Sequence, residues 1–95
     1  MDTKDKVVAI RKLMVIIVET VMEGDSFIGV PGGHIYAAMM TIGMGIDSFN
    51  TIMAGLVDSG VIKKSGQCYH ITELGKEFVA ASKRVEARQI VDRVS

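Results

Sequence analysis

Two short runs of β-branched and aromatic residues constrain the fold of this chain more than any other feature. Residues 61–64 and 69–72 form these runs, and the four residues between them include Ser65, Gly66 and Gln67. Two such runs joined by a short connection that contains glycine are typical of a β-hairpin. We therefore expect a hairpin, and any fold for this chain has to place it among the helical patterns on either side.

Four segments carry apolar residues at the three-and-four spacing of one helical face. Residues 3–22, which contain neither Gly nor Pro, form the first, and a second begins at Pro31 and ends before Gly43 and Gly45. A third ends at Gly60, and a fourth follows the hairpin. The faces that we expect to be buried are Val7, Ile10, Leu13, Met14, Ile17 and Val21 in the first helix, Ile35, Ala38, Met39 and Ile42 in the second, Phe49, Ile52, Met53, Leu56 and Val57 in the third, and Leu74, Phe78, Ala81 and Val85 in the fourth.

Helix caps and one extended piece complete the expected order of elements. The side-chain oxygen of Asp47 or Ser48 is suited to cap the third helix, and that of Thr72 the fourth, because each accepts hydrogen bonds from the free amides of a first turn. A short extended piece is expected at Phe27, Ile28 and Val30.

The length and composition fit one small domain. The chain has 95 residues, of which 48% are hydrophobic and 23% charged, so it is long enough for one core and too short for two. The expected fold is mainly α with a small β-hairpin (α+β), in the order helix, short strand, helix, helix, hairpin, helix. Within this single domain, residues 1–95, we expect the N-terminal helix at 1–23, a helix-turn-helix at 31–59, the hairpin at 61–72 and the C-terminal helix at 73–95.

The segment from Ile46 to Phe78 resembles the winged helix-turn-helix family of DNA-binding domains. It reads IDSFNTIMAGLVDSGVIKKSGQCYHITELGKEF, in which the third helix ends in Leu56, Val57 and Gly60 just before the hairpin. The resemblance implies a winged-helix protein that binds double-stranded DNA, as a small dimeric transcriptional regulator.

The resemblance also implies which residues contact DNA. In such proteins the helix after the tight turn enters the major groove, and the hairpin, or wing, touches the backbone. The residues expected to face bases are Ser48, Asn50, Thr51 and Ala54. The residues expected to contact phosphate from the wing are Lys63, Lys64 and Gln67.

The charges leave a second interpretation open. Eleven basic and eleven acidic residues give a net charge of zero, and the third helix, residues 47–59, contains two Asp and no Lys or Arg. Because strong binding to a duplex draws on several cations, the alternative is a winged-helix protein-protein interaction module without DNA binding. A third hypothesis is a ligand-sensing variant with a pocket between helices lined by Met.

A homodimer is expected from apolar residues that have no obvious partner in their own helix. Val8, Val15 and Met22, seven residues apart, run along the edge of the polar side of the first helix, and Val91 and Val94 lie on a rotated face at the end of the fourth. Exposed apolar rows of this kind are usually covered. Burial under the C-terminal helix of the same chain is the other explanation for the first row.

Nothing in the sequence suggests an enzyme, a cofactor or a metal site. His34, Cys68 and His70 lack the recurrent short spacing of a structural zinc site, and no nucleophile or carboxylate pair stands in a catalytic motif. The single cysteine fits a reducing compartment, which favours the cytoplasm. The most apolar stretch, residues 13–18, is far shorter than the roughly 18 to 20 residues that cross a bilayer, so no membrane association is expected.

Overall fold

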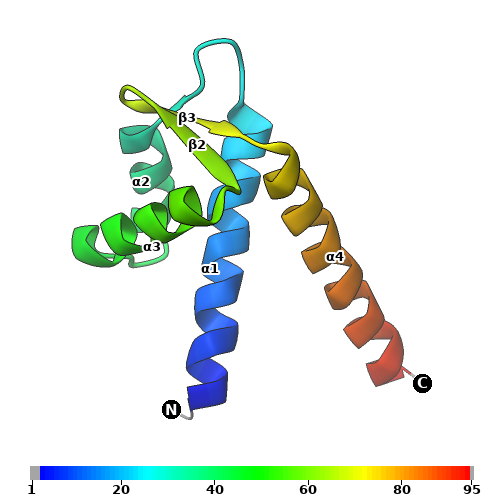
Figure 1. Ribbon diagram of the computed structural model, residues 1–95. Coiled ribbons are helices and arrows are strands. Elements are labelled where there is room, and N and C mark those ends of the chain that lie inside the picture. The colour runs from blue at the N-terminus through cyan, green and yellow to red at the C-terminus, as the bar shows by residue number, and fades with distance from the viewer. Residues whose placement is uncertain (1–2, 95) are drawn as a thin grey trace.

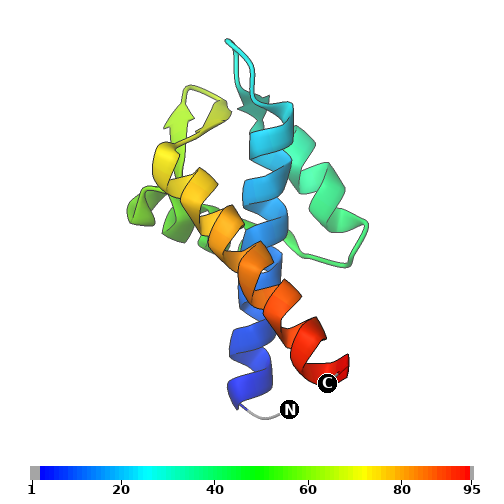
Figure 2. The ribbon, with the colours of Figure 1, turned by 90° about the vertical axis from the view of Figure 1, so that its right-hand side faces the viewer.

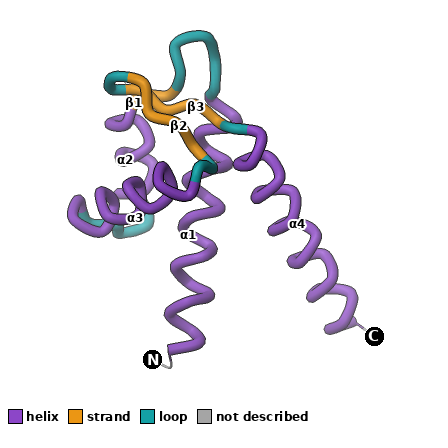
Figure 3. The backbone as a smooth tube through the Cα atoms, in the orientation of Figure 1, coloured by secondary structure: helices purple, strands orange, loops and turns teal. Residues whose placement is uncertain are grey.

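The computed structural model of the protein describes the backbone of residues 3–94 and the side chains of residues 9–85. Its elements follow the expected order, and Figures 1 and 3 show them packed around a small sheet. They are α1 (Thr3–Gly24), β1 (Val30–Pro31), α2 (Gly32–Met40), α3 (Ile46–Ser59), β2 (Ile62–Ser65), β3 (Cys68–Ile71) and α4 (Glu73–Val94). The predicted α+β fold with a hairpin after the third helix is therefore confirmed, and its order of elements is compatible with a winged-helix-like topology.

The sheet has three antiparallel strands in the order β1-β3-β2. Ser65 pairs with Cys68, so the hairpin turn consists of Gly66 and Gln67 alone. Gly66 has a φ of +61°, and none of the non-glycine residues described here has a positive φ. A positive φ at the first turn residue only is the type II′ pattern, whose twist suits a tight hairpin.

The extended piece expected at Phe27, Ile28 and Val30 is shorter than predicted. Only Val30 joins the sheet, opposite Tyr69, whereas Phe27 is 101% exposed and Ile28 74% exposed. The cause is a turn before the strand, in which the Gly29 amide donates to the Ser26 carbonyl at 3.1 Å and Gly29 takes a φ of +90°. This turn holds both apolar side chains out in solvent.

The core lies where the C-terminal half of α1 meets α2, α3, the sheet and the start of α4. Its fully buried side chains include Ile17 and Val18 of α1 and Ile35 of α2. The tilted rings of Tyr36 and Phe49 pack with their centroids 5.0 Å apart and so fix α2 against α3. The complete buried set is Ile17, Val18, Val21, Val30, Ile35, Met39, Met44, Phe49, Met53, Leu56, Val61, Ile62 and Val79.

The apolar face expected on α1 is fully buried only toward its C-terminal end. Ile17 and Val21 are buried, but Ile10 is 45% exposed and Leu13 and Met14 are only half-buried, while the Val7 side chain lies outside the described residues. The prediction was wrong for Ile10, whereas Leu13 and Met14 pack against the core as half-buried side chains. The N-terminal turns extend past the body of the domain (Figure 1).

The helix-turn-helix differs from expectation at its connection. α2 ends at Met40, which leaves Ile42 54% exposed in the turn, and Ala38 is exposed as well. α3 begins at Ile46 with Gly45 as its N-cap and no capping side chain, so the predicted cap at Asp47 or Ser48 is wrong. Asp47 lies inside the first turn instead, where the helix dipole favours a carboxylate. The predicted inner face of α3 is buried at Phe49, Met53 and Leu56 and half-buried at Ile52 and Val57.

The Thr72 cap of α4 is confirmed. Its hydroxyl accepts a hydrogen bond from the Gly75 amide at 3.0 Å and donates one to the Gly60 carbonyl at 2.6 Å. The same side chain therefore ties the start of α4 to the end of α3.

The apolar stripe predicted on α4 is wrong. Leu74 is 50% exposed and Val85 55% exposed, Ala81 is exposed and Phe78 half-buried, whereas Val79 is 2% exposed. Gly75 explains the rotation, because a Cβ there would overlap the Val61 carbonyl oxygen and lie 2.7 Å from Ile71 Cδ1. The glycine turns its own side of α4, with Val79, against the sheet. α4 then diverges from α1 (Figure 1), and the view in Figure 2 shows the two helices crossing.

Candidate nucleic-acid and protein interface

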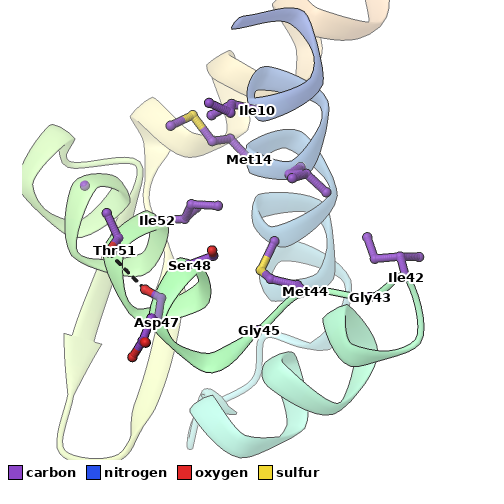
Figure 4. A pocket seen from close by; sticks show the side chains of 12 residues that line it. Ile10, Met14, Ile42, Gly43, Met44, Gly45, Asp47, Ser48, Thr51 and Ile52 are labelled. Atoms are coloured by element: carbon purple, nitrogen blue, oxygen red, sulfur yellow. Dashed lines mark hydrogen bonds between the residues drawn. The ribbon is translucent and has the colours of Figure 1, made fainter. Parts of the chain in front are cut away.

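The four residues expected to face bases lie on two different sides of α3. Ser48, Asn50, Thr51 and Ala54 are all exposed. Ser48 and Thr51, however, line an open groove between α3 and α1, whereas Asn50 and Ala54 do not (Figure 4). The Thr51 hydroxyl also donates to the Asp47 carbonyl of its own helix at 2.9 Å. The structure therefore does not present these residues as one surface.

The groove has a volume of about 640 Å³ and a largely apolar lining. Ile10, Leu13 and Met14 of α1 form one wall, the α2–α3 turn forms the floor, and α3 forms the other wall (Figure 4). Asp47 is the only charged residue of the lining. Gly55 has no side chain, so the α3 wall is open at this position. A Cβ at residue 55 would have no described atom within 4 Å.

A backbone turn closes the floor of the groove. The amides of Ile42 and Met44 both donate to the Met39 carbonyl at 3.2 Å, and Gly43 takes a φ of +87°. Met44 is thereby buried, while Ile42 stands exposed at the rim. The turn therefore adds one more apolar side chain to the opening of the groove.

The outer side of α3 carries negative charge. Asp47, Asn50, Ala54 and Asp58 are exposed and follow one another at intervals of three and four residues, which places them on one helical stripe. The stripe thus has an acidic residue near each end and no cation. A duplex approaching α3 meets Asn50 and Ala54 flanked by two carboxylates.

The wing supplies two cations beside α3. Lys63 and Lys64 are exposed on β2, which packs next to α3, and Gln67 is exposed at the hairpin turn. Lys63 lies opposite His70 and Lys64 opposite Tyr69, so the two ammonium groups leave opposite faces of the ribbon. The Gly32 amide donates to the Gln67 carbonyl at 3.0 Å and so anchors the wing turn to the start of α2. In Figure 2, α3 and the wing lie on the same side of the molecule.

Sequence reasoning missed a hydrogen-bonded pair that fixes the loop after α1 to the wing. Asp25 Oδ1 lies 2.9 Å from His70 Nδ1, and Asp25 Oδ2 accepts the Ile71 amide at 3.1 Å. Gly29 passes beneath this pair, where a Cβ would come within 2.9 Å of His70 Nε2. Only an acidic residue just after the Gly24 helix end hinted at such a partner. Within the described part of the chain, no three His, Cys, Asp or Glu residues gather in a way that could hold a metal ion.

The residues expected at a dimer interface differ in their burial, and the side chains of only some of them are described. Val15 and Met22 are half-buried, and Met22 packs against the core, while the side chains of Val8, Val91 and Val94 lie outside the described residues. Among the described side chains of α1, the large apolar ones that are exposed are Ile10 and Ile16. Among the described helices, none is long and apolar enough to span a membrane.

Comparison of the chain with protein families, with curated proteins and with solved structures found no match.

Proposed function

We propose that this chain is a winged-helix DNA-binding protein that acts as a small dimeric transcriptional regulator in the cytoplasm, and that it binds without catalysing a reaction. The observation that carries the proposal is the shared surface of α3 and the wing, where an exposed helix lies beside a ribbon with two exposed lysines. A helix beside a basic ribbon suits a duplex, because the helix fits the major groove while the ribbon follows the backbone.

The exposed outer side of α3 supports a narrower set of proposed contacts than the sequence predicts. Asn50 and Ala54 are the base-facing pair, since an Asn amide can bond adenine at two points and an Ala methyl can pack on the thymine methyl. Lys63, Lys64 and Gln67 contact phosphate. Ser48 and Thr51 belong to the groove and take no part in these contacts.

The charge balance makes phosphate contact by the wing the main source of affinity. Each bound phosphate releases counterions, and this gain has to offset the repulsion from Asp47 and Asp58 on α3. Two lysines per subunit contact few phosphates and so contribute little binding free energy. We therefore expect modest affinity with limited sequence discrimination.

Fluorescence anisotropy with a labelled duplex tests the proposal. The protein is expected to bind at low salt and more weakly at high salt, and the double variant Lys63→Glu/Lys64→Glu is expected to lose binding. Lys76→Glu on α4 is the matched control, because Lys76 is exposed and pairs only with Glu73 among the described residues. Absence of binding at low salt, or full binding by the double variant, refutes DNA recognition through the wing.

A second candidate is favoured by the acidic outer side of α3 and by the apolar groove. Here the domain is a protein-protein interaction module that holds an apolar helix carrying a cation opposite Asp47. A synthetic helical peptide with leucines at positions i, i+3 and i+7 and one lysine is the probe, with a glutamate version as its control. Saturable binding of the lysine peptide to the double wing variant, together with no DNA binding by the wild type, supports this candidate over the first.

A further inference from the structure

We propose that Ser65, the last residue of β2, is a phosphorylation site for an ATP-dependent serine kinase that recognises basic residues, and that the phosphate prevents the wing from contacting DNA. The effect on DNA rests on the proposed function, whereas the site itself does not. Ser65 stands between two lysines and the tight turn of the wing.

The tip of the wing is open to a second protein. Residues 63–67 are all exposed and form the longest such run among residues 9–85. β2 is an edge strand of the sheet, so one side of its backbone has no strand beside it. Lys63, Lys64 and Ser65 are therefore extended already, and a second protein can bind them along this edge without unfolding the domain.

The hydroxyl of Ser65 is not engaged by the described part of the chain. Among residues 9–85, the hydroxyls of Ser26, Ser48 and Ser65 form no hydrogen bond to other described residues. Ser26 follows Asp25 and Ser48 follows Asp47, whereas Ser65 follows two lysines. The other serine and threonine hydroxyls of this range each donate to a backbone carbonyl; they belong to Thr20, Thr41, Thr51, Ser59, Thr72 and Ser82.

The charges around Ser65 favour both the enzyme and its product. Residues 61–72 contain two lysines and neither Asp nor Glu, so an acidic binding cleft meets cations without a carboxylate to repel it. Lys63 and Ser65 are two residues apart on β2 and thus share one face of the ribbon. A phosphate on Ser65 therefore lies beside one ammonium group on that face and next in sequence to another.

The modification is a phosphoryl transfer. The Ser65 hydroxyl oxygen attacks the γ-phosphorus of ATP, and the bond from that phosphorus to the oxygen bridging to the β-phosphate breaks, so that ADP leaves. The hydroxyl proton passes to a carboxylate base of the kinase. The product is a phosphate ester, and nothing is oxidised or reduced.

The added charge acts on the proposed DNA contacts directly. A phosphate ester carries a charge of about −1.5 to −2 at neutral pH, which offsets the two positive charges of Lys63 and Lys64. The wing then presents almost no net charge to the duplex, and the new phosphate repels the phosphates of the DNA. Since the wing is the proposed main source of affinity, DNA is released.

Phosphorylation of the full chain by a serine kinase that selects basic residues before the serine, with Mg·ATP, tests the site. Mass spectrometry is expected to find the phosphate on Ser65, and none in Ser65→Ala. The variant Lys63→Gln/Lys64→Gln keeps the hydroxyl and is expected to slow the initial rate at least about tenfold. A kinase that selects acidic residues is the control enzyme and is expected to leave Ser65 unmodified.

The effect on DNA is tested without a kinase, by building phosphoserine into position 65 during synthesis. This protein is expected to bind a labelled duplex at least about tenfold more weakly than the unmodified protein at low salt. Ala81→phosphoserine is the matched control, because Ala81 is exposed on α4, which runs away from the wing (Figure 1). Its affinity is expected to change less than about twofold. Urea denaturation of both phosphoproteins confirms that they are folded.

Two results would overturn the inference. Labelling that avoids Ser65, or that proceeds equally fast in Lys63→Gln/Lys64→Gln, rejects the site. Unchanged DNA affinity of the protein with phosphoserine at position 65, beside an unmodified protein that binds, rejects the effect of the phosphate. The unmodified protein is titrated first, so a failure of DNA binding itself is recorded as a failure of the proposed function.

Discussion

Asp25 and His70 are 45 residues apart in the sequence and 2.9 Å apart in space. Because a carboxylate only accepts hydrogen bonds, His70 Nδ1 is the donor, and the second carboxylate oxygen accepts the Ile71 amide. One side chain therefore holds both the imidazole and the backbone of the central strand. It also fixes the loop that exposes Phe27.

Removal of this carboxylate should destabilise the domain. Asp25→Ala leaves the part-buried Ile71 amide and His70 Nδ1 without their partner, and we expect a loss of about 2 kcal/mol in the free energy of unfolding. Urea denaturation measures it. Asp58→Ala, at an exposed position on α3, is the control and should change stability by less than about 0.5 kcal/mol. Equal losses in both variants would show that the Asp25 contacts contribute nothing.

Gly75 should tolerate no side chain. Gly75→Ala forces a Cβ against the Val61 carbonyl, so α4 must shift away from the sheet, and we expect a loss of about 2 to 3 kcal/mol. Gly55→Ala is the matched control, because the helix there has open space and alanine should stabilise it by about 0.5 to 1 kcal/mol. Thermal melting that ranks Gly75→Ala above the wild type would contradict the packing of α4.

Substitution of two valines on α4 should reduce the stability of the domain by very different amounts. Val79 is 2% exposed and Val85 55% exposed, so Val79→Ala should lose about 2 kcal/mol of stability and Val85→Ala less than about 0.5 kcal/mol. Chemical denaturation of both variants checks this directly. A larger loss of stability for Val85→Ala than for Val79→Ala would support the apolar stripe that the sequence predicts. It would contradict the observed rotation of α4.

The proposed phosphate contacts set a limit on the salt dependence of DNA binding. If Lys63 and Lys64 of both subunits each contact one phosphate, the slope of log K against log salt should be about −3.6. Lys64→Ala removes two of these contacts from the dimer and should halve the slope. Anisotropy titrations at several salt concentrations provide both values. A much steeper wild-type slope would mean that cations outside the wing bind the duplex.

Features that depend on near neighbours in the sequence could be predicted. The hairpin follows from two β-branched runs and a glycine, and the Thr72 cap follows from a hydroxyl just before a helix. The N-terminus of α3 was not predictable in this way, because Gly45 is extended and caps the helix without a side chain. Asp47 and Ser48 are better capping residues, yet the buried turn at Met44 starts the helix earlier.

Features that depend on contacts between distant segments could not be predicted. The periodicity of α1 gives the correct face but not how much of it the other helices cover, so Ile10 was assigned to the core. The rotation of α4 is set by the approach of Gly75 to Val61, which no spacing rule contains. The separation of Ser48 and Thr51 from Asn50 likewise requires knowing that α1 runs beside α3.

The overhang of α1 has a consequence for local dynamics. Its turns around Ile10 and Met14 are packed on one wall only, so in a single subunit they should open without unfolding the core, and their amide protons should exchange with solvent sooner than those near Val18. Deuterium uptake along this one helix should therefore fall from its N-terminal end toward Val18.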